Sequence, residues 1–255
     1  MTDYLLLRLY GPMASWGEIA VGESRHSAVH PSRSALLGLL GAALGVERSD
    51  EAGQHALVEG YRCGIKLQSV GSPLRDYHTV QVGVAPRKFQ FRSRRQELAA
   101  DKVETILSSR EYRCDSLALV AVEVLPDAPA DLDELAQALR QPRFPLYLGR
   151  KSCPLALPLS PQRISATNLR EALDGLELPS LLGLLDPRQP QQVWPTRQDR
   201  QAFRLGQVRY YWEEGMQAGM TPSFDSWRHD QPLSRRRWQF APRREWVALS
   251  EGDQG

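Results

Sequence analysis

The chain has 255 residues, 42% of them hydrophobic and 24% charged, and a formal net charge of +2. A folded chain of this length buries roughly 70–75% of its extended surface, so the composition excludes a disordered protein and allows one large or two modest cores. No run of about 18 apolar residues occurs, and the N-terminus has neither a basic segment nor a cleavage site. We therefore expect a cytoplasmic protein with no membrane association.

The first elements are a strand, a loop and a helix. Residues 3–11 are rich in strand-forming apolar residues, and residues 13–31 contain turn residues without a sustained period. Residues 32–46 have leucines at helical spacing, with Ser32 or Ser34 as the N-cap and Gly45 as a C-cap. Gly38 and Gly41 lie inside this helix, where each costs about 1 kcal/mol relative to alanine. We expect tight helix-to-sheet packing there in preference to ligand contact.

The following segments complete an α+β order. Residues 61–71 and 74–84 are predicted to form a strand pair, and residues 110–126 one long strand, with a cationic insertion before it. Residues 131–142 predict a short helix that ends at Pro142. The order strand, helix, strand, strand, helix, strand indicates a ferredoxin-like or RRM-like fold. After residue 158 the chain is proline-rich, with short strands expected at residues 207–214 and 244–249.

Cationic segments point to a polyanionic partner. Only four of the 32 cationic residues are lysines, and arginine grips phosphate and stacks on bases better than lysine does. Residues 86–95 and 235–244 each combine five cations with two aromatic residues, a pattern that suits flexible nucleic acid. A GC-rich genome, a solvated face or a protein contact would explain the same features. For residues 235–244 we favour a protein contact.

Residues 145–154, PLYLGRKSCP, are suited to holding a phosphate. Gly149 is followed by two cations, Arg150 and Lys151, and by the hydroxyl of Ser152, in a loop closed by prolines. The spacing is not that of a P-loop, because no glycine stands five residues before Gly149. An NTPase is therefore not expected, and the loop is interpreted as a phosphate site without nucleotide hydrolysis.

Catalytic and metal-binding signals are weak. The three cysteines form no CxxC pair and the five histidines have no ligand spacing, so we expect no metal, cofactor or disulfide. Arg75, Tyr77 and His78 supply the residue types that metal-free RNA cleavage needs. Adjacent strand residues point to opposite faces, however, so structural or base-stacking roles are favoured for Tyr77 and His78.

Several motifs together resemble one family. Residues 7–17, 30–46, 74–80, 110–115, 147–155 and 228–247 occur in the order and spacing of the CasD subunits of type I-E CRISPR surveillance complexes, called Cascade. The resemblance covers most of residues 1–160 and 210–250, whereas residues 165–205 match poorly and are interpreted as a variable insertion.

The resemblance implies a fold, a domain organisation and a site. Residues 1–160 would form a ferredoxin-like palm of the RAMP superfamily with a thumb hairpin at about residues 80–110, and residues 161–255 a β-rich C-terminal region. The palm residues expected to bind RNA are Met13, Trp16, Gly17, Arg33, Ser34, Gly38, Arg75, Tyr77, His78, Tyr147, Gly149, Arg150, Lys151 and Ser152. The thumb cations are Arg87, Lys88, Arg92, Arg94 and Arg95.

The resemblance also implies partners and leaves three functions to compare. The first is a non-catalytic subunit that caps the 5′ handle of the crRNA, joins the backbone CasC subunits to the large subunit CasA, and meets target DNA through the assembled complex, with processing left to CasE. The second is a metal-free endoribonuclease, because the related type I-C subunit cleaves repeat RNA. The third is a protein-interaction module with incidental basicity. Two of the site residues also have a structural alternative to RNA binding. Trp16 could belong to the core, and Tyr147 could pack against the first helix.

Overall fold

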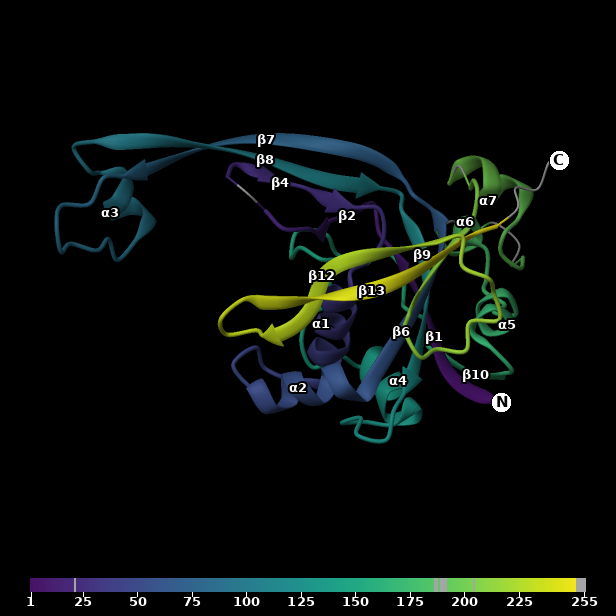
Figure 1. Cartoon of the computed structure of the whole chain (residues 1–255). Helices are drawn as coiled ribbons and strands as arrows, with labels where there is room; N and C mark the ends of the chain where they lie inside the picture. Colours follow the sequence, from purple (N-terminus) through teal and green to yellow (C-terminus); the bar gives the residue numbers. More distant parts are fainter. Residues whose placement is uncertain (21, 186–187, 189–191, 204, 251–255) are drawn as a thin grey trace.

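A seven-stranded antiparallel sheet forms the centre of the protein, with the strand order β10-β1-β9-β6-β11-β13-β12 (Figure 1). The computed structural model describes residues 1–20, 22–185, 188, 192–203 and 205–250. The strands of this sheet are β1 (Thr2–Tyr10), β6 (Tyr61–Ser69), β9 (Leu117–Val124), β10 (Gln162–Ala166), β11 (Arg209–Glu213), β12 (Phe224–Ser234) and β13 (Gln239–Leu249).

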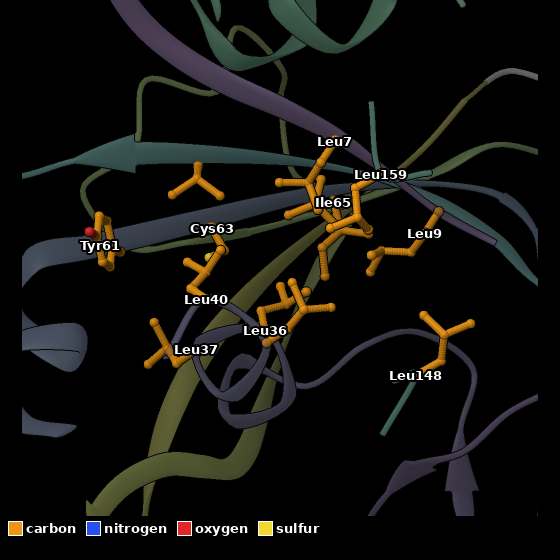
Figure 2. Packing of buried hydrophobic residues seen from close by; sticks show 14 of the residues in the cluster. Leu7, Leu9, Leu36, Leu37, Leu40, Tyr61, Cys63, Ile65, Leu148 and Leu159 are labelled. Atoms are coloured by element: carbon orange, nitrogen blue, oxygen red, sulfur yellow. The ribbon is translucent and has the colours of Figure 1, made fainter. Parts of the chain in front are cut away.

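Both faces of the sheet are covered, which explains why β1 is apolar along its length. Leu5, Leu7 and Leu9 pack on one face against α1 (Arg33–Leu44), α2 (Glu51–Gly60) and α4 (Leu132–Arg140). Tyr4 and Leu6 pack on the other face with α5 (Leu169–Asp174) and α6 (Leu181–Leu185), beside α7 (Arg197–Ala202). Each fully buried leucine contributes about 1.5–3 kcal/mol. Figure 2 shows the first of these clusters, where leucines of α1 point at the sheet.

Helix α1 begins and ends where the sequence predicts. The Ser32 hydroxyl accepts a hydrogen bond from the Ala35 N–H at 3.2 Å, and Gly45 closes the helix with a φ of 82°. The interior glycines do permit close approach, but not to the sheet. A Cβ on Gly41 would lie 2.8 Å from Leu57 of α2, and one on Gly38 would lie 3.0 Å from Nη2 of Arg235. Tight packing was therefore expected correctly, but the neighbours of these glycines are α2 and Arg235 and not the face of the sheet.

The predicted strand pair of residues 61–71 and 74–84 does not form. β6 pairs with β9 and β11, whereas β7 (Ser72–Gly83) pairs along its whole length with β8 (Val103–Cys114) in a separate sheet. The predicted long strand at residues 110–126 is likewise two strands, because Asp115 has a φ of 57° between β8 and β9. A Cβ on Gly71 would lie 2.3 Å from the Cys114 carbonyl, so both segments leave the central sheet at this crossing.

The β7–β8 hairpin, residues 72–114, projects far from the body and carries helix α3 (Arg94–Leu98) near its tip (Figure 1). Its base is broadened by β2 (Met13–Ala14) and β4 (Ser24–Arg25), which both pair with β8. β3 (Trp16–Gly17) and β5 (Ser27–Ala28) form a small pair next to it. The hairpin is thus longer than the thumb expected at about residues 80–110.

The C-terminal region continues the central sheet. The strands expected at residues 207–214 and 244–249 are confirmed as β11 and part of β13, and both belong to the same sheet as β1. The β12–β13 hairpin runs over α1 and extends to the same side as the β7–β8 hairpin (Figure 1). The division of the chain at residue 160 stays a prediction. The expected insertion at residues 165–205 contains α5, α6 and α7 and lies in part outside the described residues.

Candidate nucleic-acid interface

The loop of residues 145–154 is fixed to the segment that follows β2. The Ser15 N–H donates to the Leu148 carbonyl at 3.0 Å, and the Leu148 N–H donates to the Cys153 carbonyl at 2.7 Å. Gly149 has a φ of 83°, and a Cβ there would lie 1.9 Å from the Ser15 carbonyl oxygen. Leu148 is buried and points into the core (Figure 2). The loop is therefore a rigid turn that brings residues 149–152 next to residues 13–17.

The three polar residues after Gly149 lie in different surroundings. The Arg150 guanidinium lies 5.1 Å from the ring centroid of Tyr112, and its Nη1 is buried without a hydrogen-bond partner. Lys151 and Ser152 are exposed. Met13 pairs with Cys114 at the hairpin base, close to this turn. A cation with an unused donor and a lysine that has no ion pair in the described residues thus lie together beside the base of the β7–β8 hairpin.

A pocket of about 1080 Å³ lies above the exposed side of α1. Its walls are residues 17–20, residues 145–149 and parts of the β12–β13 hairpin, and α1 forms its floor. Five of the predicted site residues line it: Gly17, Ser34, Gly38, Tyr147 and Gly149. Tyr147 is 37% exposed and lines the pocket together with residues of α1, so both the RNA-binding role and the alternative of packing on the first helix stay predictions. Two motifs distant in sequence therefore contribute to one concave surface.

Trp16 and Arg33 lie inside the protein. Trp16 is 3% exposed and belongs to the core, as its structural alternative anticipated. The Arg33 guanidinium donates to Glu213 at 2.6 Å, to Gln231 at 2.6 Å and to the carbonyls of Val58 and Tyr61. Because all three of its nitrogens are engaged in the interior, we leave Arg33, like Trp16, out of the nucleic-acid surface.

A buried charge network joins α1 to the C-terminal strands. Arg243 forms ion pairs with Asp230 at 2.6 Å and with Glu245 at 2.7 Å, and His30 contacts Glu245 at 2.9 Å. Burial would raise the pKa of Glu245, but the hydrogen bond from His30 and the charges of Arg243 and Arg228 lower it to about 2. This network ties β12 and β13 to each other and to His30, which precedes α1.

The three predicted residues of β7 lie on the hairpin, outside the pocket lining. Arg75 forms a 2.8 Å ion pair with Glu111 and thereby lowers the pKa of that carboxyl group. Tyr77 is 63% exposed, and His78 contacts Asp76 two residues away on the same face. Tyr77 and His78 thus point to opposite faces, as the sequence predicts.

The thumb cations are exposed at the hairpin tip, residues 84–102. Arg94 pairs with Glu97 at 2.6 Å. Arg87, Lys88, Arg92 and Arg95 form no ion pair within the described part of the chain. Phe89 and Phe91 pack edge to face with ring centroids 5.3 Å apart. The tip thus offers unpaired cations together with aromatic surface, the combination that single-stranded nucleic acid binds.

The second cationic segment is not one surface. Arg243 belongs to the buried network, and Arg244 pairs with Asp225 at 2.9 Å. Arg235, Trp238 and Phe240 line the pocket. The preferred interpretation of residues 235–244 as a contact to other subunits stays a prediction, and the structure adds these intrachain contacts to it. The mixture of aromatic and cationic residues in the sequence indicated a binding surface. It did not indicate which of the arginines form ion pairs with acidic residues of the same chain.

Metal-ligand clusters and membrane-spanning helices were sought in the described part of the chain. Within residues 1–20, 22–185, 188, 192–203 and 205–250, no group of three or more His, Cys, Asp or Glu side chains is arranged to hold a metal ion. In the same residues, no helix has the length and apolar character needed to cross a membrane.

Comparisons with known proteins place the chain in a family. A family model described as CRISPR-associated protein (Cas_Cas5) matches residues 4–245. The CRISPR system Cascade subunit CasD of Escherichia coli (strain K12) is 37% identical over 181 residues, which cover 68% of this chain and 76% of the relative. A chain of a CRISPR RNA-guided surveillance complex matches with a TM-score of 0.64 and 26% identity, covering 98% of this chain and 91% of that one. A structure titled as a Cas protein matches in fold, with a TM-score of 0.56, 23% identity and coverage of 97% and 93%. The chain therefore belongs to the Cas5 family of CRISPR-associated proteins.

Proposed function

We propose that the chain is a non-catalytic, crRNA-binding subunit of a type I-E Cascade complex, in which it caps the 5′ handle of the crRNA. The relative CasD is a Cascade subunit, and a structural neighbour comes from an RNA-guided surveillance complex. The observation that carries the proposal is the β7–β8 hairpin, which projects from the body (Figure 1). In the described residues, Arg87, Lys88, Arg92 and Arg95 at its tip form no ion pair, and Gly17 and Gly149 near its base line a pocket.

The hairpin has the properties of a segment that needs a partner. An isolated two-stranded hairpin is marginally stable in water, and only the base of this one is broadened by further strands. Val80, Leu98, Val103 and Ile106 are exposed along its outer part. A strand of RNA, together with neighbouring CasC subunits, would cover these side chains. Contact to CasA and to target DNA would follow from assembly of the complex in the cytoplasm.

The proposed palm is ferredoxin-like, of the RAMP type. The order β10-β1-β9-β6, with α1 between β1 and β6 and α4 between β9 and β10, corresponds to the order fourth, first, third, second of a βαββαβ unit. The hairpin is inserted between its second and third strands. This strand order supports the proposal of a ferredoxin-like palm with the hairpin as an insertion.

The endoribonuclease alternative is less well supported. Metal-free cleavage needs an acid or base and a cation at one phosphate. His78 and Tyr77 point to opposite faces, and His78 is occupied by Asp76. We therefore assign binding without cleavage. Full-length RNA recovered after prolonged incubation with the purified chain is the expected result, and repeat RNA cut at one position would overturn the non-catalytic assignment.

Binding is tested with a single-stranded RNA of CRISPR-repeat sequence and fluorescence anisotropy over a range of salt concentrations. Arg92→Gln combined with Arg95→Gln should weaken binding and reduce the slope of log K against log salt by about 1.4, since each phosphate contact on a single strand contributes about 0.7. The matched control, Arg197→Gln with Arg200→Gln, removes two exposed cations from α7 on the other face of the sheet. Equal effects of both pairs would refute the hairpin as an RNA contact.

The same assay addresses the loop of residues 145–154. Arg150→Ala with Lys151→Ala should reduce the slope by up to about 1.4 if both cations contact phosphate. Purification of the tagged chain from its host, followed by sequencing of the associated small RNA, supplies the cellular test. RNAs with one fixed 5′ end in the repeat, together with other Cascade subunits, are the expected result. Protein partners without RNA would instead favour the interaction module.

A further inference from the structure

Arg235 reaches from the turn of the β12–β13 hairpin across the surface of α1. Its Nη2 donates to the Ser34 carbonyl at 2.6 Å, in the first turn of that helix. The same nitrogen lies 3.0 Å from the position of a Cβ on Gly38. A glycine at position 38 therefore leaves room for the guanidinium to lie against the helix. This places a half-buried cation at the floor of the pocket.

The surroundings of Arg235 are aromatic and positive. Its guanidinium carbon lies 5.9 Å from the ring centroid of Trp238 and 6.0 Å from that of Phe240. Arg48 lies 4.2 Å from the same Trp238 ring, and its Nε donates to the Arg235 carbonyl. Burial and the charge of Arg48 lower the pKa of Arg235. Two guanidinium groups thus lie on one indole ring. Their mutual repulsion would be reduced by an anion bound between or beside them.

Neither arginine has a carboxylate partner. Glu51, the acid at this turn, accepts hydrogen bonds from the Ser234 hydroxyl at 3.1 Å and the Arg236 N–H at 2.9 Å. In the described residues, Arg235 and Arg48 form no ion pair. The acids that line the pocket are Asp230, which is held by Arg243, and Glu18, which is exposed.

Three other arginines of the same hairpin differ from Arg235. Arg228, Arg243 and Arg244 each have a carboxylate within 4 Å. In the described residues, Arg235 is half-buried without a carboxylate partner, and it lines the pocket of about 1080 Å³. A planar guanidinium in such a setting is suited to bind phosphate through two parallel hydrogen bonds.

We propose that Arg235 binds a phosphate of single-stranded RNA in the pocket over α1, with Trp238 and Phe240 beside the adjoining nucleotides. The inference rests on the proposed RNA-binding function and adds the C-terminal hairpin to the RNA site. Gly38 acts as a positioning residue, because it allows the guanidinium to reach the helix. Arg48 packs on the Trp238 ring, 4.2 Å from its centroid, and so helps to hold the indole in place.

The test compares Arg235→Gln with Arg236→Gln in the full-length chain. Both variants remove one positive charge from the same turn, but Arg236 is exposed and its side chain does not line the pocket. The probe is a 12-nucleotide single-stranded RNA of repeat sequence, measured by anisotropy as a function of salt. Arg235→Gln should weaken binding about tenfold and lower the salt slope by about 0.7, whereas Arg236→Gln should change neither by as much.

A conservative variant distinguishes phosphate binding from a structural role. Arg235→Lys keeps the charge but not the planar fork, so the salt slope should stay at the wild-type value while the affinity falls several-fold. This variant also decides the question if Arg235→Gln does not fold. Probes with a 5′-phosphate and with a 5′-hydroxyl separate a terminal phosphate from an internal phosphodiester, since only a terminal phosphate would make the effect of Arg235→Gln depend on the end group.

Three outcomes would count against the proposal in different ways. Equal affinity and slope for Arg235→Gln and Arg236→Gln would overturn it while leaving RNA binding through the β7–β8 hairpin intact. Loss of complex assembly by Arg235→Gln with unchanged RNA binding would also overturn it and assign the residue to a protein contact. A wild-type chain that binds no RNA, alone or in its complex, would instead refute the proposed function itself.

Discussion

Arg33 is expected to stabilise the fold and not to bind RNA, and Arg33→Met tests this distinction. The substitution removes the guanidinium but keeps an unbranched chain of similar length. In the protein, Arg33 and Glu213 form a 2.6 Å ion pair with side chains only 5% and 11% exposed. The other guanidinium bonds reach Gln231 and the carbonyls of Val58 and Tyr61. The variant would leave a buried carboxylate without its partner.

The expected loss is about 3–5 kcal/mol in the free energy of unfolding, the range for removing one member of a buried pair. For a chain of this size, each kcal/mol lowers the unfolding temperature by about 2–4 °C, so the total is roughly 6–20 °C. Burial raises the pKa of Glu213, and Arg33 is the first of the charges that oppose this rise. Without Arg33 the carboxyl should take up a proton more readily, so the deficit should be smaller at pH 5 than at pH 8.

Thermal unfolding followed by circular dichroism measures the stability, and anisotropy well below the transition measures RNA affinity. Arg236→Met is the matched control, because that side chain is exposed. Glu213→Gln combined with Arg33→Met removes both charges and should recover part of the loss, since Gln can still accept the hydrogen bond from the Cys63 N–H. An unchanged unfolding temperature together with lost RNA affinity would refute the reasoning and return Arg33 to the binding surface.

Two further predictions follow from the same geometry. Because the pKa of Glu245 is lowered to about 2 from an ordinary value of 4.5, its contribution of roughly 3 kcal/mol should be present above pH 4.5 and be lost as the pH falls towards 2. Acid titration of Glu245→Gln should therefore show a weaker pH dependence in that window, and an unaltered dependence would contradict the assignment. Gly149→Ala should lower the unfolding temperature and weaken RNA binding, because its Cβ would lie 1.9 Å from the Ser15 carbonyl at a φ of 83°. Gly206→Ala is the control, since a Cβ there meets nothing within 4 Å and Gly206 does not line the pocket, and equal effects of the two would be inconsistent with the loop geometry.

Elements encoded by local signals were predictable from the sequence. Helix α1 carries its own caps in Ser32 and Gly45, and α4 begins at the acidic residue Asp131. β1 is apolar because both of its faces are covered. In each case the deciding interactions lie within a few residues of the chain, so the period and the capping residues were sufficient.

Strand pairing and the surroundings of single side chains were not predictable in this way. β7 resembles a partner for β6 in sequence, but the crossing at Gly71 and Asp115 turns both β7 and β8 out of the central sheet. Arg33 likewise belongs to a helix start that resembles a binding motif, yet Glu213 reaches it from a strand 180 residues away. Such contacts depend on the assembled fold, and no local pattern records them.

The many arginines of the chain therefore serve two different purposes, which the structure distinguishes and the sequence does not. One group, which includes Arg33 and Arg243, is buried with carboxylates, and its charge is used to hold α1, β11, β12 and β13 together. Another group, formed by Arg235 and by Arg87, Arg92 and Arg95 at the tip of the β7–β8 hairpin, has no acid partner in the described residues. The interior pairs cancel in net charge, so an overall value of +2 conceals local positive surfaces. Those surfaces lie on two hairpins that extend to the same side of the protein (Figure 1).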